Sequence, residues 1–197
     1  MSHFAGFLIA FVGFATHLCA EHLAMTIRVL DQANLPPSKV KKMERYVEAA
    51  LAPIEVDVKW VDCASNIDAC KTPRSANEFW LRILAQMPPK ASPGTDILGF
   101  TQHGDVDGIQ CVNVFFPMVE QFSGQVGIDL NQIFAAAVVH EIGHLYLGTN
   151  SQAHSRTGIM CGTWSHREIE LLSIGELTFT RDQGSRIRAA MNGAVGL

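Results

Sequence analysis

The sequence predicts one α+β domain in which a mixed, twisted β-sheet packs against a long central helix, with a further helix near the C-terminus. Apolar segments of strand length recur up to about residue 116, and a period of three to four residues replaces them after residue 129. A chain of 197 residues with 48% apolar and 17% charged residues can bury one sizeable core. Its net charge of −4, without a run of Lys or Arg, argues against a nucleic-acid-binding protein.

The first 20 residues differ from the rest of the chain because they contain no Asp, Glu, Lys or Arg. An apolar run from Phe4 to Ala15 is followed by the small residue Ala20 and then by Glu21. This order is typical of a secretory signal peptide, so we expect a signal peptide over residues 1–20 and a single domain over residues 21–197. The mature protein would be secreted or periplasmic, without stable membrane association. A buried core helix or an uncleaved anchor is the alternative, although the run is shorter than the ~20 apolar residues of a membrane span.

The cysteines agree with export. Cleavage would remove Cys19 and leave an even number, Cys63, Cys70, Cys111 and Cys161. A short polar loop separates Cys63 from Cys70, so we expect these two to form a disulfide, which leaves Cys111 with Cys161. Four thiols would be expected instead if the protein stayed in the cytosol.

Strand and helix patterns alternate before residue 60. Residues Ala24–Leu30 alternate in polarity and predict a strand. Pro36 and Pro37 precede a helical pattern over Ser38–Leu51, where apolar residues recur every three or four positions. Residues Ile54–Trp60 then alternate apolar with charged side chains, which is the strongest strand pattern in the chain.

Three apolar runs in the middle of the chain predict further strands, over Phe79–Ala85, Ile97–Thr101 and Gln110–Phe116. The turn-rich residues 103–108 separate the last two runs, which indicates a hairpin.

The helical period dominates the last third. Asp129 can cap a helix, with Gln132 as its reciprocal capping partner, and this helix should run to about Leu147. Gly148 is expected to end it in a left-handed conformation. An irregular loop should follow, and then a final helix over about Arg181–Met191.

The predicted central helix carries a pattern of metal-binding chemistry. His140 and His144 are four residues apart and therefore lie on one face of the helix, where they can take two corners of a zinc tetrahedron. Glu141 lies beside that face and could take a proton from a metal-bound water. A core helix with two surface histidines is the alternative. The apolar segment Ile133–Val139 argues against it by predicting burial, and Gly143 suggests the close passage of another backbone, such as a substrate.

These residues resemble the metzincin metallopeptidases, whose pattern is His-Glu-x-x-His-x-x-Gly-x-x-His followed by a Met-turn. Here HEIGHLYLG occupies residues 140–148, His154 follows, and Gly-Ile-Met ends at Met160. The chain also resembles a group of uncharacterised secreted bacterial proteins that carry HEIGHLLLG, a His-Ser, a Gly-Ile-Met, a Trp like Trp164, and a Phe-Thr like residues 179–180.

The resemblance implies a zincin-like fold and a secreted zinc endopeptidase. In such an enzyme His140, His144 and His154 would hold Zn²⁺, Glu141 would be the general base, and Met160 would form an apolar floor under the metal. The substrate would be a protein or peptide.

Two departures from the metzincin pattern leave alternatives open. Gly148 lies four residues after His144 rather than three, and His154 lies ten after it rather than six. A glutamate, Glu168 or Glu170, could therefore complete the site in place of His154.

Some metzincins also place a Tyr after the Met to stabilise the tetrahedral intermediate, and no Tyr follows Met160 here. His166 is a possible substitute, and a surface histidine is the alternative.

Two further expectations concern what the domain does. The predicted strand near Ile97–Thr101 or the one near Cys111–Phe116 could be a sheet edge that pairs with an extended substrate. A secreted zinc-binding or interaction protein without catalysis is the competing function. The presence of Glu141 argues against it, because a structural zinc site has no use for that carboxylate.

Overall fold

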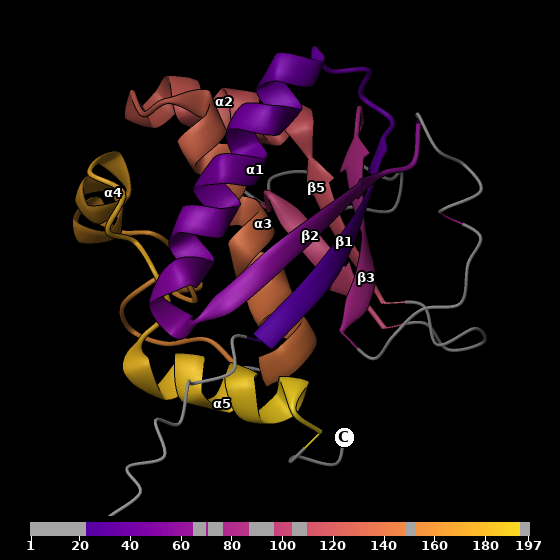
Figure 1. Cartoon of the computed structure of the whole chain (residues 1–197). Helices are drawn as coiled ribbons and strands as arrows, with labels where there is room; N and C mark the ends of the chain where they lie inside the picture. Colours follow the sequence, from indigo (N-terminus) through magenta and orange to yellow (C-terminus); the bar gives the residue numbers. More distant parts are fainter. Residues whose placement is uncertain are drawn as a thin grey trace, which may run out of the picture.

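The computed structural model describes residues 23–64, 70, 77–86, 97–103, 110–148 and 153–193. Within these residues a single five-stranded sheet packs against helices (Figure 1). The strands are β1 (Leu23–Asp31), β2 (Val56–Asp62), β3 (Glu78–Leu84), β4 (Gly99–Gln102) and β5 (Cys111–Phe115). The helices are α1 (Pro37–Leu51), α2 (Phe116–Val126), α3 (Leu130–Leu147), α4 (His166–Ser173) and α5 (Arg181–Met191), and a short 3-10 helix, η1, covers Ala52–Ile54.

The sheet is mixed, as predicted. Its strand order is β2-β1-β3-β5-β4, with every neighbouring pair parallel except β4 and β5. The antiparallel pairing of β4 with β5 confirms the predicted hairpin relation of these two strands. β4 is an edge strand, whereas β5 lies between β3 and β4. Of the two strands expected to offer an edge, only the one near Ile97–Thr101 does so.

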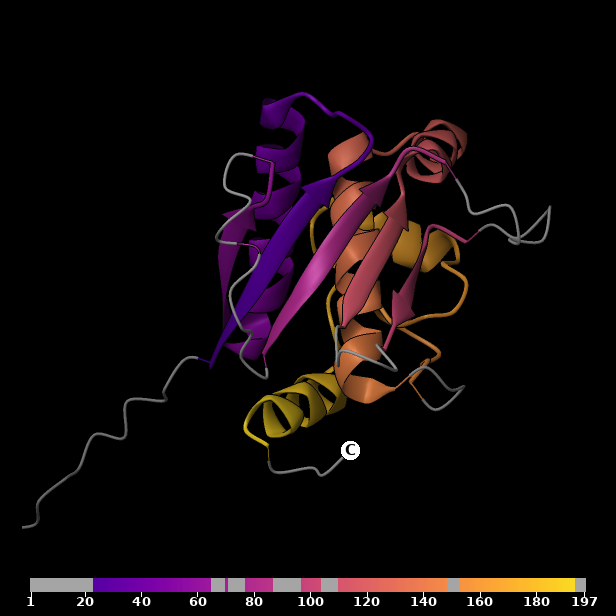
Figure 2. The same ribbon diagram turned by 90° about the vertical axis from the view of Figure 1, so that its right-hand side faces the viewer.

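Helix α3 is the centre of the domain. Figures 1 and 2 show α1 and α3 side by side on one face of the sheet, with α5 across one end of α3. The predicted apolar segment Ile133–Val139 is buried throughout. A helix that is apolar on every side is stable only where it is surrounded, and α3 contacts the sheet, α1, α2, α4 and α5. None of the described helices is both long and apolar enough to cross a bilayer.

The predicted elements agree with the structure within a few residues, with two helices missed. α2 follows β5 without a break, so the apolar run of the strand conceals the change of period at Phe116. α4 has only eight residues and lies in what we expected to be an irregular loop. β2 begins two residues later than predicted, because Ile54 ends η1 and Glu55 adopts a left-handed conformation with φ 57°.

Both predicted ends of α3 are in place, but their details differ from expectation. Asp129 caps the helix by accepting a hydrogen bond from the Asn131 backbone at 2.9 Å. Gln132 is not its reciprocal partner, since its amide donates to the carbonyls of Leu172 and Ser173 and thereby ties α4 to α3. Gly148 ends the helix at φ 92° and ψ 169°, a glycine conformation that is extended rather than left-handed helical.

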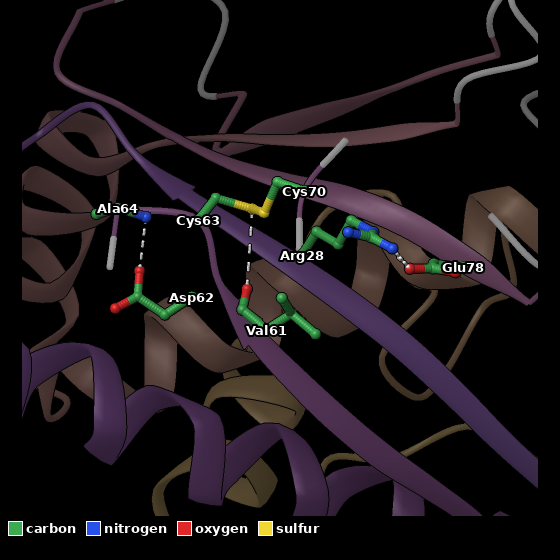
Figure 3. Close-up of a disulfide and its surroundings, with 7 residues drawn as sticks. All are labelled: Arg28, Val61, Asp62, Cys63, Ala64, Cys70 and Glu78. Atoms are coloured by element: carbon green, nitrogen blue, oxygen red, sulfur yellow. Dashed lines mark hydrogen bonds and ion pairs between the residues drawn. A yellow bond between two sulfur atoms is a disulfide. The ribbon is translucent and has the colours of Figure 1, made fainter. Parts of the chain in front are cut away.

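The predicted disulfide between Cys63 and Cys70 is present, with Cα atoms 5.7 Å apart (Figure 3). It lies near a buried ion pair between Arg28 of β1 and Glu78 of β3. The expected pairing of Cys111 with Cys161 is wrong, because both are thiols. Cys111 is buried in the internal strand β5, while the Cys161 thiol donates to the Thr163 carbonyl of its own turn at 3.1 Å.

The predicted signal peptide, Met1–Ala20, lies outside the described residues. So do most of the residues expected to form the turn between β4 and β5.

Candidate metal centre

Three histidines come together beside the sheet. His140 and His144 lie one turn apart on α3, and His154 comes from the segment that follows the helix. One ring nitrogen of each lies within 4.8 Å of the others. The His154 ring centroid is 4.9 Å from that of His144 and 5.5 Å from that of His140. The cluster could therefore hold one metal ion through three imidazoles.

Backbone carbonyls orient the two histidines of the helix. The Nδ1–H of His140 donates to the Ile159 carbonyl at 2.7 Å, and the Nδ1–H of His144 donates to the Gly148 carbonyl at 2.9 Å. Because a carbonyl only accepts, both Nδ1 atoms carry hydrogen. In the neutral rings both Nε2 atoms therefore keep a lone pair.

The Nε2 atoms of His140 and His144 face each other at 3.2 Å. Two lone pairs at this distance repel each other unless a proton or a cation lies between them. Two nitrogens bound to one tetrahedral zinc at about 2.0–2.1 Å would be about 3.3 Å apart. The spacing of the pair and the three-imidazole donor set fit Zn²⁺ in a site that keeps a fourth position open.

Burial keeps the helix histidines in the form that binds metal. Desolvation lowers the pKa of His140 to about 4 and also lowers the pKa of His144. Both rings are therefore neutral at pH 7, and a metal ion would not have to displace a proton from either. His154 is exposed, so the cluster opens toward solvent on that side.

Glu141 lies next to the histidines, on the side of α3 that faces β4. Its side chain is buried, and one carboxylate oxygen, Oε2, accepts a hydrogen bond from the Thr101 hydroxyl at 2.9 Å. Desolvation raises the pKa of Glu141 to about 7, against the opposing effect of the Thr101 hydrogen bond. A bound cation would stabilise the ionised carboxylate and would therefore lower the pKa of Glu141, as the Thr101 hydrogen bond does.

A cleft of about 640 Å³ gives access to the histidines and to Glu141. Edge strand β4 forms one wall, and the turn around Gly162 and Trp164 forms another. Phe122 of the unpredicted helix α2 also lines it. Most of the lining is apolar, with the three imidazoles and the carboxylate grouped at one place, which is the usual character of a ligand site.

The segment after α3 folds back and thereby returns His154 to the helix. The Ser155 backbone donates to the Met160 carbonyl at 3.0 Å and so closes a tight turn. The Ile159 backbone donates to the Thr178 carbonyl at 3.0 Å, which fixes that turn to the segment before α5. The Ile159 carbonyl accepts both from His140 and, at 3.2 Å, from the Trp164 indole. The same turn therefore positions two of the three histidines.

Met160 lies fully buried against α3 at Gly143. A Cβ atom at Gly143 would be 2.2 Å from the Met160 sulfur and 2.9 Å from the Phe179 ring. The expectation that a substrate backbone passes Gly143 is therefore wrong, because the side chains of Met160 and Phe179 occupy that space. Gly143 lies between His140 and His144 in the sequence of α3, so Met160 packs against the helix at the turn that carries this pair.

The glutamates proposed as alternative ligands lie elsewhere. The Glu168 carboxylate caps α4 by accepting from the Ser165 backbone at 3.0 Å and from the Ser165 hydroxyl. Glu170 is exposed and does not belong to the histidine cluster. His166, considered as a substitute for the missing Tyr, is exposed at the start of α4 and does not line the cleft.

Two residues of this site were not found from the sequence. Thr101 ends a strand that we predicted, but nothing in the sequence indicates which strand borders α3. Trp164 was noted only for its resemblance, and its hydrogen bond to the Ile159 carbonyl depends on the turn. The predicted hairpin and the resemblance were the only signals for these two residues.

Replacing His154 by Ala should weaken zinc binding more than about 100-fold, since loss of groups that merely orient ligands already costs about 10–100-fold. His166→Ala is the matched control, and Glu168→Ala should retain zinc while losing about 1 kcal/mol of stability with its cap. Competition with a chelator of known affinity, with elemental analysis, measures zinc binding, and urea unfolding measures the stability. Retention of a full equivalent of zinc in the His154 variant, with loss in a glutamate variant, would assign the third ligand to the glutamate.

Replacing Gly143 by Ala should destabilise the domain by about 1–3 kcal/mol, because the new methyl group meets the buried Met160 and Phe179 side chains. Gly124→Ala in α2 is the control. A Cβ there has no neighbour within 4 Å, and Ala should stabilise the helix by about 0.5–1 kcal/mol. Urea unfolding measures both. Equal stability of the Gly143 variant and the wild type would show that Met160 does not pack there.

Comparison of the chain with protein-family models and with curated proteins found no match. Among solved structures it is similar to archaemetzincin from Methanopyrus kandleri, with 16% sequence identity and a TM-score of 0.49. The similarity covers 88% of this chain and 98% of the archaemetzincin chain. This likeness assigns no activity to the chain.

Proposed function

We propose that this protein is a zinc-dependent peptidase. The observation that carries the proposal is the convergence of His140, His144 and His154 with the buried carboxylate of Glu141 on one cleft. Three imidazoles leave one coordination position of zinc open, which distinguishes catalytic from structural zinc sites. A carboxylate beside that position has a role in hydrolysis and none in holding a structural ion.

His140, His144 and His154 would hold the zinc ion, which would supply Lewis acidity: it would make a water more acidic and polarise the peptide carbonyl. Glu141 then acts as general base. It takes a proton from the water as the oxygen attacks the peptide carbonyl, and gives that proton to the amine nitrogen as the C–N bond breaks. The carbonyls of Ile159 and Gly148 keep His140 and His144 in the required tautomer throughout.

The shape of the cleft supports a peptide as the substrate. One wall is β4, and β5 pairs with one side of that strand while no described strand pairs with the other. An extended peptide could therefore add to the sheet through main-chain hydrogen bonds and pass the histidines and Glu141. The apolar lining would receive apolar side chains of the substrate.

We further propose that the protein is exported after cleavage of residues 1–20. The disulfide between Cys63 and Cys70 supports this, since such bonds persist in oxidising compartments. The charge-free apolar run before Glu21 is the independent support.

Replacing Glu141 by Gln should leave zinc bound and reduce peptide hydrolysis by at least about 100-fold, since Gln has a similar shape but cannot accept the proton. Glu170→Gln, on the exposed side of α4, is the matched control. Zinc content and digestion of an unbiased peptide library, with and without chelator, measure the two effects.

Wild-type turnover in the Glu141 variant would show that another group is the base. A zinc-loaded wild type that cleaves no library peptide would favour the alternative of a non-catalytic zinc-binding protein.

Export predicts the covalent state of the mature protein. Protein recovered from the extracellular or periplasmic fraction should begin near Glu21, and non-reducing peptide mapping should find Cys63 linked to Cys70. Cys161 should react with a thiol reagent in the same sample, as the internal control. Recovered protein that begins at Met1, or that carries Cys63 and Cys70 as thiols, would refute the proposal.

A further inference from the structure

The carboxylate of Glu141 is held by a residue of the opposite wall of the cleft. The Thr101 hydroxyl lies 2.9 Å from Oε2 of Glu141 and 2.8 Å from the backbone carbonyl oxygen of the same residue. Among the described residues, no other group forms a hydrogen bond with the Glu141 side chain. The contact joins β4 to α3 across 40 positions of sequence.

Thr101 has one hydroxyl hydrogen for these two acceptors. A hydrogen bond to an ionised carboxylate is shorter and stronger than one to a neutral carbonyl. The hydroxyl therefore donates to Oε2 while Glu141 is charged. Oε1 has no hydrogen-bond partner among the described residues, and Glu141 lines the cleft, so Oε1 is the oxygen left for the chemistry.

The backbone of β4 lies directly against the same side chain. A Cβ atom at Gly99 would be 3.0 Å from Cγ of Glu141 and 2.6 Å from the Asn113 carbonyl oxygen. The Asn113 side chain also donates to the Phe100 carbonyl at 3.3 Å, which fixes β4 on β5. The strand that carries Thr101 therefore lies so close to Glu141 that a larger side chain in place of Gly99 would not fit.

We propose that Thr101 is the positioning residue of the general base. It fixes Oε2 of Glu141, so that Oε1 takes the proton from the attacking water and returns it to the leaving amine. An unrestrained Glu side chain would divide its time among several rotamers, and only some of them place an oxygen within hydrogen-bond reach of the water. This inference rests on the proposed peptidase function.

Thr101→Val removes the hydroxyl at nearly constant shape. It should lower kcat by on the order of 10- to 100-fold, the effect of losing one hydrogen bond to a charged group, with KM and zinc content unchanged. Thr101→Ser restores the hydroxyl and should restore most of kcat. Thr26→Val, on β1 outside the cleft, is the matched control and should match the wild type. The assay is hydrolysis, by the zinc-loaded full chain, of a fluorogenic peptide chosen from the library digest.

In the Glu141→Gln background, Thr101→Val should cause no further loss, because Thr101 acts only through the base. An additional loss of the same size there, or a raised KM with normal kcat, would overturn the proposal and point to a substrate contact.

Crystal structures of the wild type and of the Thr101→Val variant provide a readout that does not depend on activity. The Glu141 carboxylate should leave its position beside β4 in the variant. An unchanged position would overturn the inference, whether or not the protein proves to be a peptidase. Absence of hydrolysis by the wild type, combined with movement of Glu141 in the variant, would refute the proposed function alone.

Discussion

The hydrogen bond from His140 to the Ile159 carbonyl is the contact on which the rest of the site depends. It joins the central helix to the turn that follows it, 19 residues later in the chain. The same carbonyl also accepts from Trp164, and the next residue, Met160, fills the space beside Gly143. Because His154 begins this turn, the contact that orients one histidine also brings another into the cluster.

Burial of the site has an energetic consequence. α3 places an imidazole pair and a carboxylate among apolar residues, where unpaired polar groups would cost about 1–3 kcal/mol each. Each of these groups has a partner outside the helix: the Ile159 carbonyl, the Gly148 carbonyl or the Thr101 hydroxyl. Among the described residues, the two Nε2 lone pairs and Oε1 of Glu141 have no hydrogen-bond donor. These are the atoms that hydrolysis at a metal centre requires.

Patterns within one segment predicted most of the fold, and contacts between segments account for what was missed. The bounds of α3 and α5 follow from period and capping, and Cys63 and Cys70 lie close in sequence. The partners of Gln132, Gly143 and Thr101 belong to distant segments. The sequence therefore suggested a local capping role for Gln132, a passing substrate backbone for Gly143 and no role for Thr101. The pairing of Cys111 with Cys161 was inferred only from the even number of cysteines. That number does not reveal that Cys111 lies in an internal strand.

In the proposed peptidase, the edge strand β4 would connect substrate binding with the general base. If an extended substrate pairs with the open side of β4, the backbone that binds it is the backbone that carries Thr101 to Glu141. The site would then need no separate element to align Glu141 with the scissile peptide bond, because the same strand would position both. β5 fixes that strand through ladder hydrogen bonds and through Asn113, and Gly99 lets it lie against Glu141. The shortest strand of the sheet can therefore set the geometry between the substrate and the base.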